Sequence, residues 1–329
     1  MQIKPDAPWN VDRRTALAMA MVAGAGAGLM PSLLRAAPLQ DVWPLWSMPP
    51  GGGGPAGPVA IDARAAVSNI AVPTITVVRP HRPTGAAMLI AGGGGYKRIE
   101  EGKEARPAAS WLAARGITAF ILRYRLPGEG WADGPLAPLQ DAQRALRLIR
   151  ARAGSLGIDP KRVGVLGFSA GGHLLGLAAT RSNFSSYAPI DPIDRQSARP
   201  DVAALIYPVV TLEPPYDRTS TRRVLIGAHP GAVASADWSV ETHVRAACPP
   251  MFLVQAADDP ISDPHNTLIL RDACERAHSP VELHRLPSGG HGFGMGVPGT
   301  PSAQWPQWFE PWLAALRFLA ANADRGGTR

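Results

Sequence analysis

The sequence has very few cysteines, and this shortage narrows the chemistry open to the chain. Cys248 and Cys274 are the two cysteines in 329 residues, and they show neither a C-x-x-C pair nor the Cys/His spacing of a metal site. A disulfide between them is one alternative in an oxidising compartment, but two small buried thiols are the favoured interpretation. We therefore expect no metal and no cofactor.

Lysine is also scarce, and the basic residues are dispersed. Four of the 33 basic residues are lysines, and the arginines form no dense run, although the formal net charge is +7. A nucleic-acid surface usually clusters its positive charge, so no nucleic-acid partner is expected. The glycine run 51–54 lacks the lysine and the serine or threonine of a phosphate-binding loop, and it is assigned no ligand.

Long apolar runs are missing as well, since no stretch offers the ~20 strongly apolar residues of a membrane-spanning helix. The nearest approach is an Ala/Gly-rich segment that follows Arg13-Arg14 and contains Pro31. This pattern indicates a twin-arginine export signal over residues 1–37, and hence a periplasmic or secreted protein without a stable membrane span. An uncleaved anchor is the alternative, because Ala36-Ala37 stands in a poor context for cleavage.

The chain is rich in short apolar segments. Hydrophobic residues make up 46% and charged residues 18%, which is typical of a globular protein. A Pro-, Trp- and Gly-rich stretch, 38–60, is expected to be an extended arm or a linker. Through 61–329, runs of strand length alternate with helix-like periodicity, which predicts an α/β fold with a mainly parallel, doubly wound sheet. The irregular stretch 211–248 is the expected place of a small cap.

The expected elements can be given by range. Strands are expected at 75–79, 86–91, 117–124, 163–166, 202–210, 251–256 and 281–286, and helices at 104–115, 138–153, 170–180, 266–278 and 308–322.

One strand–turn–helix segment carries the clearest chemical signal. Gly167, Ser169 and Gly171 fit G-x-S-x-G, the pattern of a nucleophile elbow. Glycine two places before and after the serine removes side chains that would collide with the neighbouring strand or helix in a strained turn. A glycine-rich turn that happens to contain serine is the alternative, so the rest of the chain must decide.

Two further candidates follow later strands, in the order Ser, Asp, His along the chain. Asp259 comes after the strand 251–256, and His291 lies in a glycine-rich loop after the strand 281–286. Residues beyond the carboxyl ends of strands meet at one edge of a doubly wound sheet. We therefore predict Ser169 as nucleophile, His291 as general base and Asp259 as the acid that orients the histidine.

The neighbours of these residues receive structural roles. Asp258 is expected to accept local backbone hydrogen bonds, and Asp263 is a weaker candidate for the acid. His173, on the helix after the elbow, is expected to be a packed helix residue.

Acyl transfer also needs N–H donors for the developing oxyanion. The backbone N–H of Ala170, which follows the nucleophile, is one expected donor. Gly94 and Gly95, in the glycine run after the strand 86–91, are expected to supply the other. Three neighbouring aromatic residues are expected to contact the substrate: Tyr96, Phe168 and Phe293.

With these residues placed, the chain resembles a bacterial family of α/β-hydrolase esterases, the acetylxylan-esterase-like and feruloyl-esterase-like lipase/esterase proteins. The resemblance covers about 43–312, and Asp259 takes the place of the family's acid although Asp263 stands where proline is usual. Matching stretches are Trp43-Pro44-Leu45-Trp46, Gly93-Gly94-Gly95-Tyr96, Tyr124-Arg125-Leu126, Arg162 to His173, Arg199-Pro200-Asp201, Pro249 to Val254 and Gly289 to Gly294.

The resemblance implies hydrolysis of short-chain carboxylic esters, with acetyl groups on polysaccharides as the expected substrates. Exported tryptophans could then stack on sugar rings, although packing is the favoured role for Trp131, Trp305 and Trp308. Two alternatives stand beside this function. One is a serine peptidase of the prolyl-oligopeptidase kind, whose usual propeller domain has no room here, and the other is a non-catalytic binding protein on the same fold.

Overall fold

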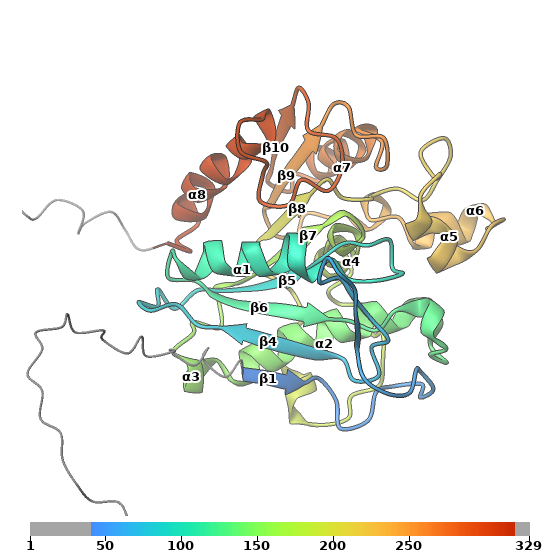
Figure 1. Cartoon of the computed structure of the whole chain (residues 1–329), viewed down its shortest axis with the longest axis vertical. Helices are drawn as coiled ribbons and strands as arrows, with labels where there is room; N and C mark the ends of the chain where they lie inside the picture. The colour runs from blue at the N-terminus through green and yellow to red at the C-terminus, as the bar shows by residue number, and fades with distance from the viewer. Residues whose placement is uncertain (1–40, 320–329) are drawn as a thin grey trace, which may run out of the picture. The chain divides into compact units, whose positions relative to one another are not determined.

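The computed structural model describes residues 41–319. The expected export signal over 1–37 and the end of the last expected helix lie outside the described residues. Within them, eight strands form one sheet in the order β1-β4-β6-β5-β7-β8-β9-β10 (Figure 1). Their bounds are β1 Asp41–Pro44, β4 Thr74–Val78, β5 Ala87–Ala91, β6 Thr118–Arg123, β7 Val163–Phe168, β8 Ala203–Ile206, β9 Met251–Ala256 and β10 Val281–Leu286.

The sheet is mainly parallel, as predicted. The neighbours in the run β6-β5-β7-β8-β9-β10 pair in parallel, while β1 and β4 add an antiparallel edge beside β6. A separate two-stranded hairpin joins β2 (Ala60–Ile61) to β3 (Val67–Ser68). Parallel pairing needs helical crossovers, and these cover both faces of the sheet. The predicted fold class, a mainly parallel α/β sheet, is therefore confirmed.

Helices pack on both faces of the sheet, and successive side chains of one strand contact different helices. Leu89 of β5 packs in one apolar cluster with α2 (Ala137–Ala151), α4 (Ser169–Thr180) and α7 (His265–Arg276). Its neighbours Met88 and Ile90 point the other way, into a cluster with α1 (Arg106–Ala113) and α8 (Trp305–Ala315). Because successive side chains of a strand point to opposite faces, a run of buried residues serves both layers.

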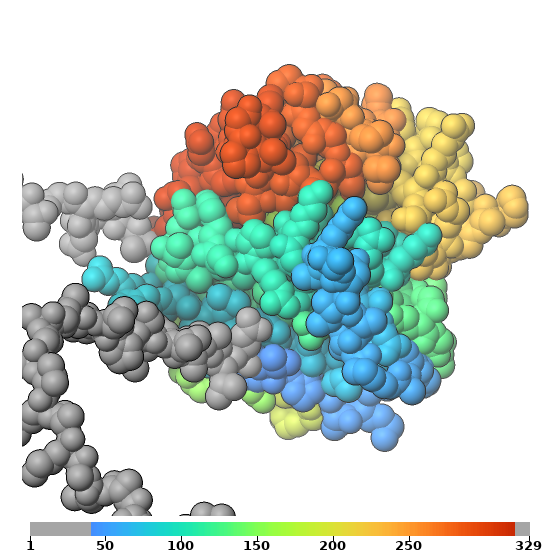
Figure 2. Space-filling model, viewed as in Figure 1, coloured from blue at the N-terminus to red at the C-terminus, as the bar shows by residue number. Residues whose placement is uncertain are grey.

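The N-terminal arm differs from the prediction. Part of the stretch expected as an arm or linker is β1, which pairs with β4 through partners such as Trp43 and Ile75. The ring of Trp43 packs on Phe120 at 6.0 Å, and Trp46 is buried with its Nε1 donating to Asp141 Oδ1 at 2.7 Å. Burial of these two indoles makes the segment part of the sheet domain. Figure 2 shows the following chain, in blue, lying across segments coloured cyan and green.

Strand β8 is shorter than the expected strand 202–210. It ends at Ile206 because Tyr207 takes a left-handed conformation, with φ +40°, and Pro208 follows. The apolar run therefore continues past the point where ladder pairing stops. This early turn brings the Tyr207 side chain to the carboxyl edge of the sheet.

The stretch 211–248, where a small cap is predicted, is mostly irregular with short helices. It contains α5 (Ser220–Ile226) and α6 (Ala232–Asp237), and both lie beyond the carboxyl ends of the strands in Figure 1. The Oγ1 of Thr219 caps α5 by accepting from the backbone N–H of Arg222 at 3.2 Å.

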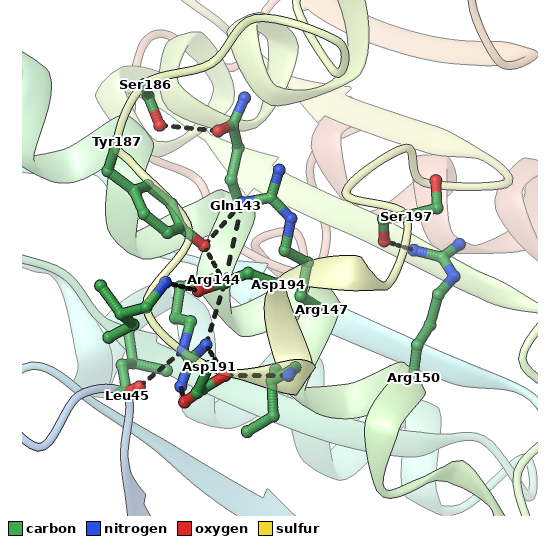
Figure 3. A network of polar contacts seen from close by, with 12 residues as sticks. Leu45, Gln143, Arg144, Arg147, Arg150, Ser186, Tyr187, Asp191, Asp194 and Ser197 are labelled. Carbon is green, nitrogen blue, oxygen red and sulfur yellow. Dashed lines mark hydrogen bonds and ion pairs between the residues drawn. The ribbon is translucent and has the colours of Figure 1, made fainter.

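Helix α2 holds the outer loops through its arginines (Figure 3). The buried Arg144 guanidinium donates to Asp191 Oδ1 at 2.8 Å, to Asp194 Oδ1 at 2.9 Å and, through Nε, to the Leu45 carbonyl at 2.9 Å. One side chain thus ties the loop after α4 and the segment after β1 to the same helix. Arg150 extends the contact by donating to the Ser197 carbonyl at 2.9 Å.

Both cysteines are buried and free, so the buried-thiol interpretation is confirmed. Cys274, on α7, lies with its Sγ 3.8 Å from the Met251 Sδ of β9. Among residues 41–319 no helix is long and apolar enough to cross a membrane.

Candidate active site

The nucleophile elbow is built as the glycine spacing requires. Strand β7 ends at Phe168, and α4 begins at Ser169, whose φ of +51° is left-handed. A Cβ on Gly167 would lie 2.5 Å from the Gly171 carbonyl oxygen, and a Cβ on Gly171 would lie 2.2 Å from the Ala91 carbonyl oxygen. Neither position can hold a larger residue without moving backbone, so the strained turn depends on both glycines.

Ser169, His291 and Asp259 form one hydrogen-bonded chain. Ser169 Oγ lies 2.8 Å from His291 Nε2, and His291 Nδ1 lies 2.8 Å from Asp259 Oδ2. The His291 side chain is 15% exposed and that of Asp259 is fully buried. The structure therefore brings together three residues separated by up to 122 positions, in the geometry of a nucleophile, a base and an orienting acid.

Asp259 is held by its own turn. Its Oδ1 accepts from the backbone N–H groups of Ile261 at 2.8 Å and Ser262 at 2.9 Å, and its Oδ2 accepts from Gln255 Nε2 at 2.9 Å. These donors fix the carboxylate and leave Oδ2 facing the histidine. A buried carboxylate needs such donors, because burial without them would be costly.

Asp258 and Asp263 serve other loops. Asp258 Oδ1 accepts from Gly289 N at 2.9 Å and from Gly290 N at 2.8 Å, so it anchors the loop that carries His291. Asp263 Oδ1 pairs with His265 Nδ1 at 2.7 Å instead. Asp258 thus accepts backbone hydrogen bonds as expected, although from a neighbouring loop.

The glycine loop lies directly against the serine. A Cβ on Gly93 would stand 2.7 Å from Ser169 Cβ, and Gly94 and Gly95 adopt φ of +110° and +63° beside Ser169 in the same pocket. As the second residue of α4, Ala170 has a backbone N–H that no carbonyl within the helix can accept. The Ala170 N–H and the backbone of the glycine loop therefore both lie beside the serine, where an oxyanion would develop.

Glu104 is a site residue that the sequence did not reveal. Its Oε2 accepts from Gly93 N at 2.6 Å, and its Oε1 accepts from Tyr207 Oη at 3.0 Å. Burial raises the pKa of this carboxyl to about 7, although both hydrogen bonds act to lower it. From the sequence it is one polar residue at the start of an expected helix, and no local pattern indicates that it reaches the glycine loop.

Tyr207 links this carboxyl to the histidine loop. Its Oη accepts from Gly294 N at 2.9 Å while donating to Glu104, and its ring packs on His291 with centroids 4.9 Å apart. The glycine loop, the histidine and the end of β8 are therefore joined through one buried phenol.

These residues open onto a pocket of about 400 Å³. Ser169, His291, Gly94 and Gly95 line it, together with Thr219–Thr221 from the cap. A Cβ on Gly95 would stand 2.1 Å from Ser220 Oγ, so the cap closes directly on the glycine loop.

The three aromatic residues expected to contact substrate do not line this pocket, and that prediction is wrong. Tyr96 is buried with its Oη 2.9 Å from His173 Nδ1. Phe168 packs against Trp305, and Phe293 against Tyr207 at 4.4 Å. All three rings are buried, so their apolar area is removed from water by the core.

The remaining candidates are structural. His173 is fully buried between Tyr96 and the Trp238 carbonyl, and burial lowers its pKa to about 4, so it is neutral near pH 7. The three tryptophans considered for sugar stacking are not among the pocket-lining residues: Trp131, Trp305 and Trp308. In residues 41–319 no group of three or more His, Cys, Asp or Glu side chains is placed to hold a metal ion.

The chain is similar to esterases and xylan-degrading proteins. The family model BD-FAE matches residues 78–273. An acetylxylan esterase of Xylanibacter ruminicola is 30% identical over 255 residues, covering 75% of this chain and 49% of that protein. Endo-1,4-beta-xylanase B of Butyrivibrio fibrisolvens is 33% identical over 210 residues, covering 62% of this chain and 32% of that protein. The chain thus spans about half or less of the length of these curated relatives.

A solved structure matches over more of its length. The crystal structure of an acetyl ester-xyloside bifunctional hydrolase from Caldicellulosiruptor lactoaceticus aligns with a TM-score of 0.69 and 32% sequence identity. The alignment covers 83% of this chain and 99% of that one.

Proposed function

The chain belongs to the BD-FAE family and has the α/β-hydrolase fold, and on this premise we propose that it is a serine carboxylic-ester hydrolase. The proposed reaction removes short acyl groups, acetyl above all, through an acyl-enzyme. The observation that carries the proposal is the hydrogen-bonded chain from Ser169 through His291 to Asp259, set against a glycine loop.

In the first half-reaction, Ser169 Oγ attacks the ester carbonyl carbon and His291 Nε2 takes the hydroxyl proton. The carbonyl oxygen becomes an oxyanion that accepts from backbone N–H groups of Ala170 and of the glycine loop at Gly94 and Gly95. When the tetrahedral intermediate collapses, His291 returns the proton to the departing alcohol. The acyl group stays on Ser169.

The second half-reaction repeats these steps with water. His291 removes a proton from a water molecule, which attacks the acyl carbonyl, and Ser169 leaves with that proton. Asp259 stabilises the imidazolium that forms twice in the cycle and keeps Nδ1 protonated, so that Nε2 faces the serine. No step calls on a metal or a cofactor.

Acetylated polysaccharide is the proposed natural substrate class. The support is the function named for two relatives, an acetylxylan esterase and an acetyl ester-xyloside bifunctional hydrolase. Export to the periplasm or the medium fits a polymeric substrate, and the support for it is the Arg13-Arg14 pair. Cell fractionation of the wild type beside an Arg13-Arg14→Lys-Lys variant tests export, which the variant should abolish.

Ser169→Ala tests the reaction class. Purified protein is assayed on p-nitrophenyl acetate, on acetylated xylan and on a dipeptide amide, with the variant beside it. Removing the nucleophile should lower kcat on the esters by about 10⁴–10⁶-fold. Full ester hydrolysis by Ser169→Ala would refute the proposal, and cleavage of the amide in preference to the esters would favour a peptidase.

A further inference from the structure

One wall of the pocket is strongly basic. Arg64, Lys97, Arg98 and Lys103 all line it, and they come from three separate segments. Arg64 lies between β2 and β3, the next two follow the glycine loop, and Lys103 precedes α1. Positive residues from the hairpin region around Arg64 and from 97–103 therefore line the pocket in front of the serine.

The two arginines have acidic neighbours. Arg98 Nε pairs with Glu100 Oε1 at 2.6 Å. Arg64 and Arg98 both lie near Asp62, whose pKa is lowered mainly by hydrogen bonds from backbone N–H groups and further by these two charges. Part of the arginine charge is therefore already balanced at the rim.

The two lysines are not balanced in this way. Neither Lys97 nor Lys103 has a carboxylate within ion-pair distance in the described part of the chain, and both are exposed. The other acid lining the pocket, Glu104, already accepts from Gly93 and Tyr207. In a sequence with four lysines among 33 basic residues, two of the four stand at this pocket.

Both lysines lie close to loops that carry site residues. Lys97 N donates to the Gly94 carbonyl at 3.1 Å, so the turn that carries Lys97 is the end of the glycine loop. Lys103 Nζ lies 3.5 Å from the position a Cβ on Gly292 would take, next to His291. Both lysines therefore line the pocket onto which Ser169 opens, and the Lys103 ammonium group lies beside the histidine loop.

We propose that the pocket selects esters that carry a negative charge near the ester group, with Lys97 and Lys103 as the binding site for that anion. The proposal rests on the proposed esterase function and names its substrate class. An ammonium group is a compact charge on a flexible stem, so two of them accept a carboxylate without a fixed bidentate geometry. The carboxylate can belong to the alcohol, as in an acetylated acidic sugar, or to the acyl group.

Matched substrate pairs test the selection. For the alcohol side, 4-acetoxybenzoate is compared with the neutral 4-acetoxybenzamide, and for the acyl side, monomethyl glutarate is compared with dimethyl glutarate. The readout is the ratio of kcat/KM for the anionic member to that for the neutral member. A Lys97→Gln/Lys103→Gln double variant should lower this ratio by roughly tenfold, since exposed ion pairs contribute modestly. High salt should lower the wild-type ratio as well.

Two controls separate the anion site from other effects. Lys161→Gln removes an exposed lysine that precedes β7, at the opposite end of that strand from Ser169, and should keep the wild-type ratio. Lys97→Arg/Lys103→Arg keeps the charge and should keep most of the preference. A ratio that falls for one substrate pair alone identifies which side of the ester bears the carboxylate.

The proposal has a clear contrary result. If the double variant lowers kcat/KM equally for both members of each pair, the lysines act on the oxyanion or on folding and the anion site is wrong. If the wild type hydrolyses the neutral esters and every variant keeps the wild-type ratio of kcat/KM, the anion site is wrong while the esterase function stands. If the wild type hydrolyses none of the four esters, that result counts against the proposed function itself.

Discussion

Asp258 and Asp259 are neighbours in the chain with different tasks. Asp259 bonds the imidazole of His291, while Asp258 bonds the backbone of the loop that carries it. Asp259→Ala should therefore lower kcat by about 10⁴-fold, as loss of the orienting acid does in related mechanisms. Asp258→Ala should cost far less, because the imidazole keeps its partner. Steady-state kinetics on p-nitrophenyl acetate decide between them, and a larger loss in Asp258→Ala would reverse the assignment.

Glu104 makes a pH dependence of stability predictable. Burial raises its folded pKa from 4.5 to about 7, so the folded state binds a proton that the unfolded state has released. The stability of the wild type should therefore fall as pH rises through the window from 4.5 to about 7. Glu104→Gln has no carboxyl group to titrate and should not show this fall. The free energy of unfolding of the variant minus that of the wild type should therefore increase by on the order of 3 kcal/mol across the window.

Urea denaturation at several pH values measures this difference. Tyr207→Phe provides a second arm, because it removes a hydrogen bond that lowers the Glu104 pKa. That variant should move the window to higher pH. Parallel stability curves for the wild type and Glu104→Gln would contradict a raised pKa.

At the residue scale, the sequence predicted which three side chains the structure brings together, because chemistry and position agreed. Ser169, Asp259 and His291 each follow an apolar run, and parallel strands bring such positions to one edge. Tyr96 and Phe168 also sit beside the site in the sequence, but their rings turn into the core. Sequence neighbourhood does not say which way a side chain points.

At the scale of elements, the crossing of α4 past the end of β5 depends on Gly171. A Cβ there would meet the backbone oxygens of Ala91 and Gly92 at 2.2 and 2.5 Å. Gly171→Ala should therefore destabilise the fold by about 1–3 kcal/mol and lower activity, because the glycine loop begins at Gly92. Thermal unfolding and ester hydrolysis measure the two effects.

Gly154 offers the matched control. It lies in α3 (Ala153–Leu156) and has open space around it. Gly154→Ala should stabilise the protein by roughly 0.5–1 kcal/mol, because alanine favours a helix over glycine. Equal effects from both substitutions would mean that contact with Ala91 is not what requires Gly171.

Element boundaries were predictable where an apolar run ended in a turn residue. The strands 251–256 and 281–286 have the predicted bounds. The expected strand 202–210 is too long, because Tyr207 leaves the ladder while the sequence stays apolar. Strand β1 was missed, since its membership depends on pairing with β4 and on the contact of Trp43 with Phe120. Such contacts between distant segments leave no local pattern.

At the scale of the whole molecule, Arg144 joins three parts of the chain. It binds Asp191, Asp194 and the Leu45 carbonyl from a nearly fully buried position. Arg144→Ala should destabilise the protein by about 3 kcal/mol, at the low end for a broken buried ion pair because Asp191 is partly exposed. Arg195→Ala, at an exposed position on the same loop, should change stability by less than about 0.5 kcal/mol.

Urea denaturation of these two variants checks the role of the network. A small loss in Arg144→Ala, similar to that in Arg195→Ala, would show that the loops are held by apolar packing instead. The same network explains why the architecture was easier to predict than the arm. Local sequence patterns indicate the alternation of strands and helices, whereas the Leu45 carbonyl is bound by a side chain 99 positions away.

Chemical labelling of the free thiol of Cys274 can measure local unfolding of this protein. Burial raises the pKa of the thiol to about 12, so the reactive thiolate is almost absent in the native state. An alkylating reagent can therefore react with Cys274 only after α7 separates from β9 and exposes the thiol. The labelling rate of Cys274 therefore measures how often that part of the sheet opens, without the introduction of a new cysteine.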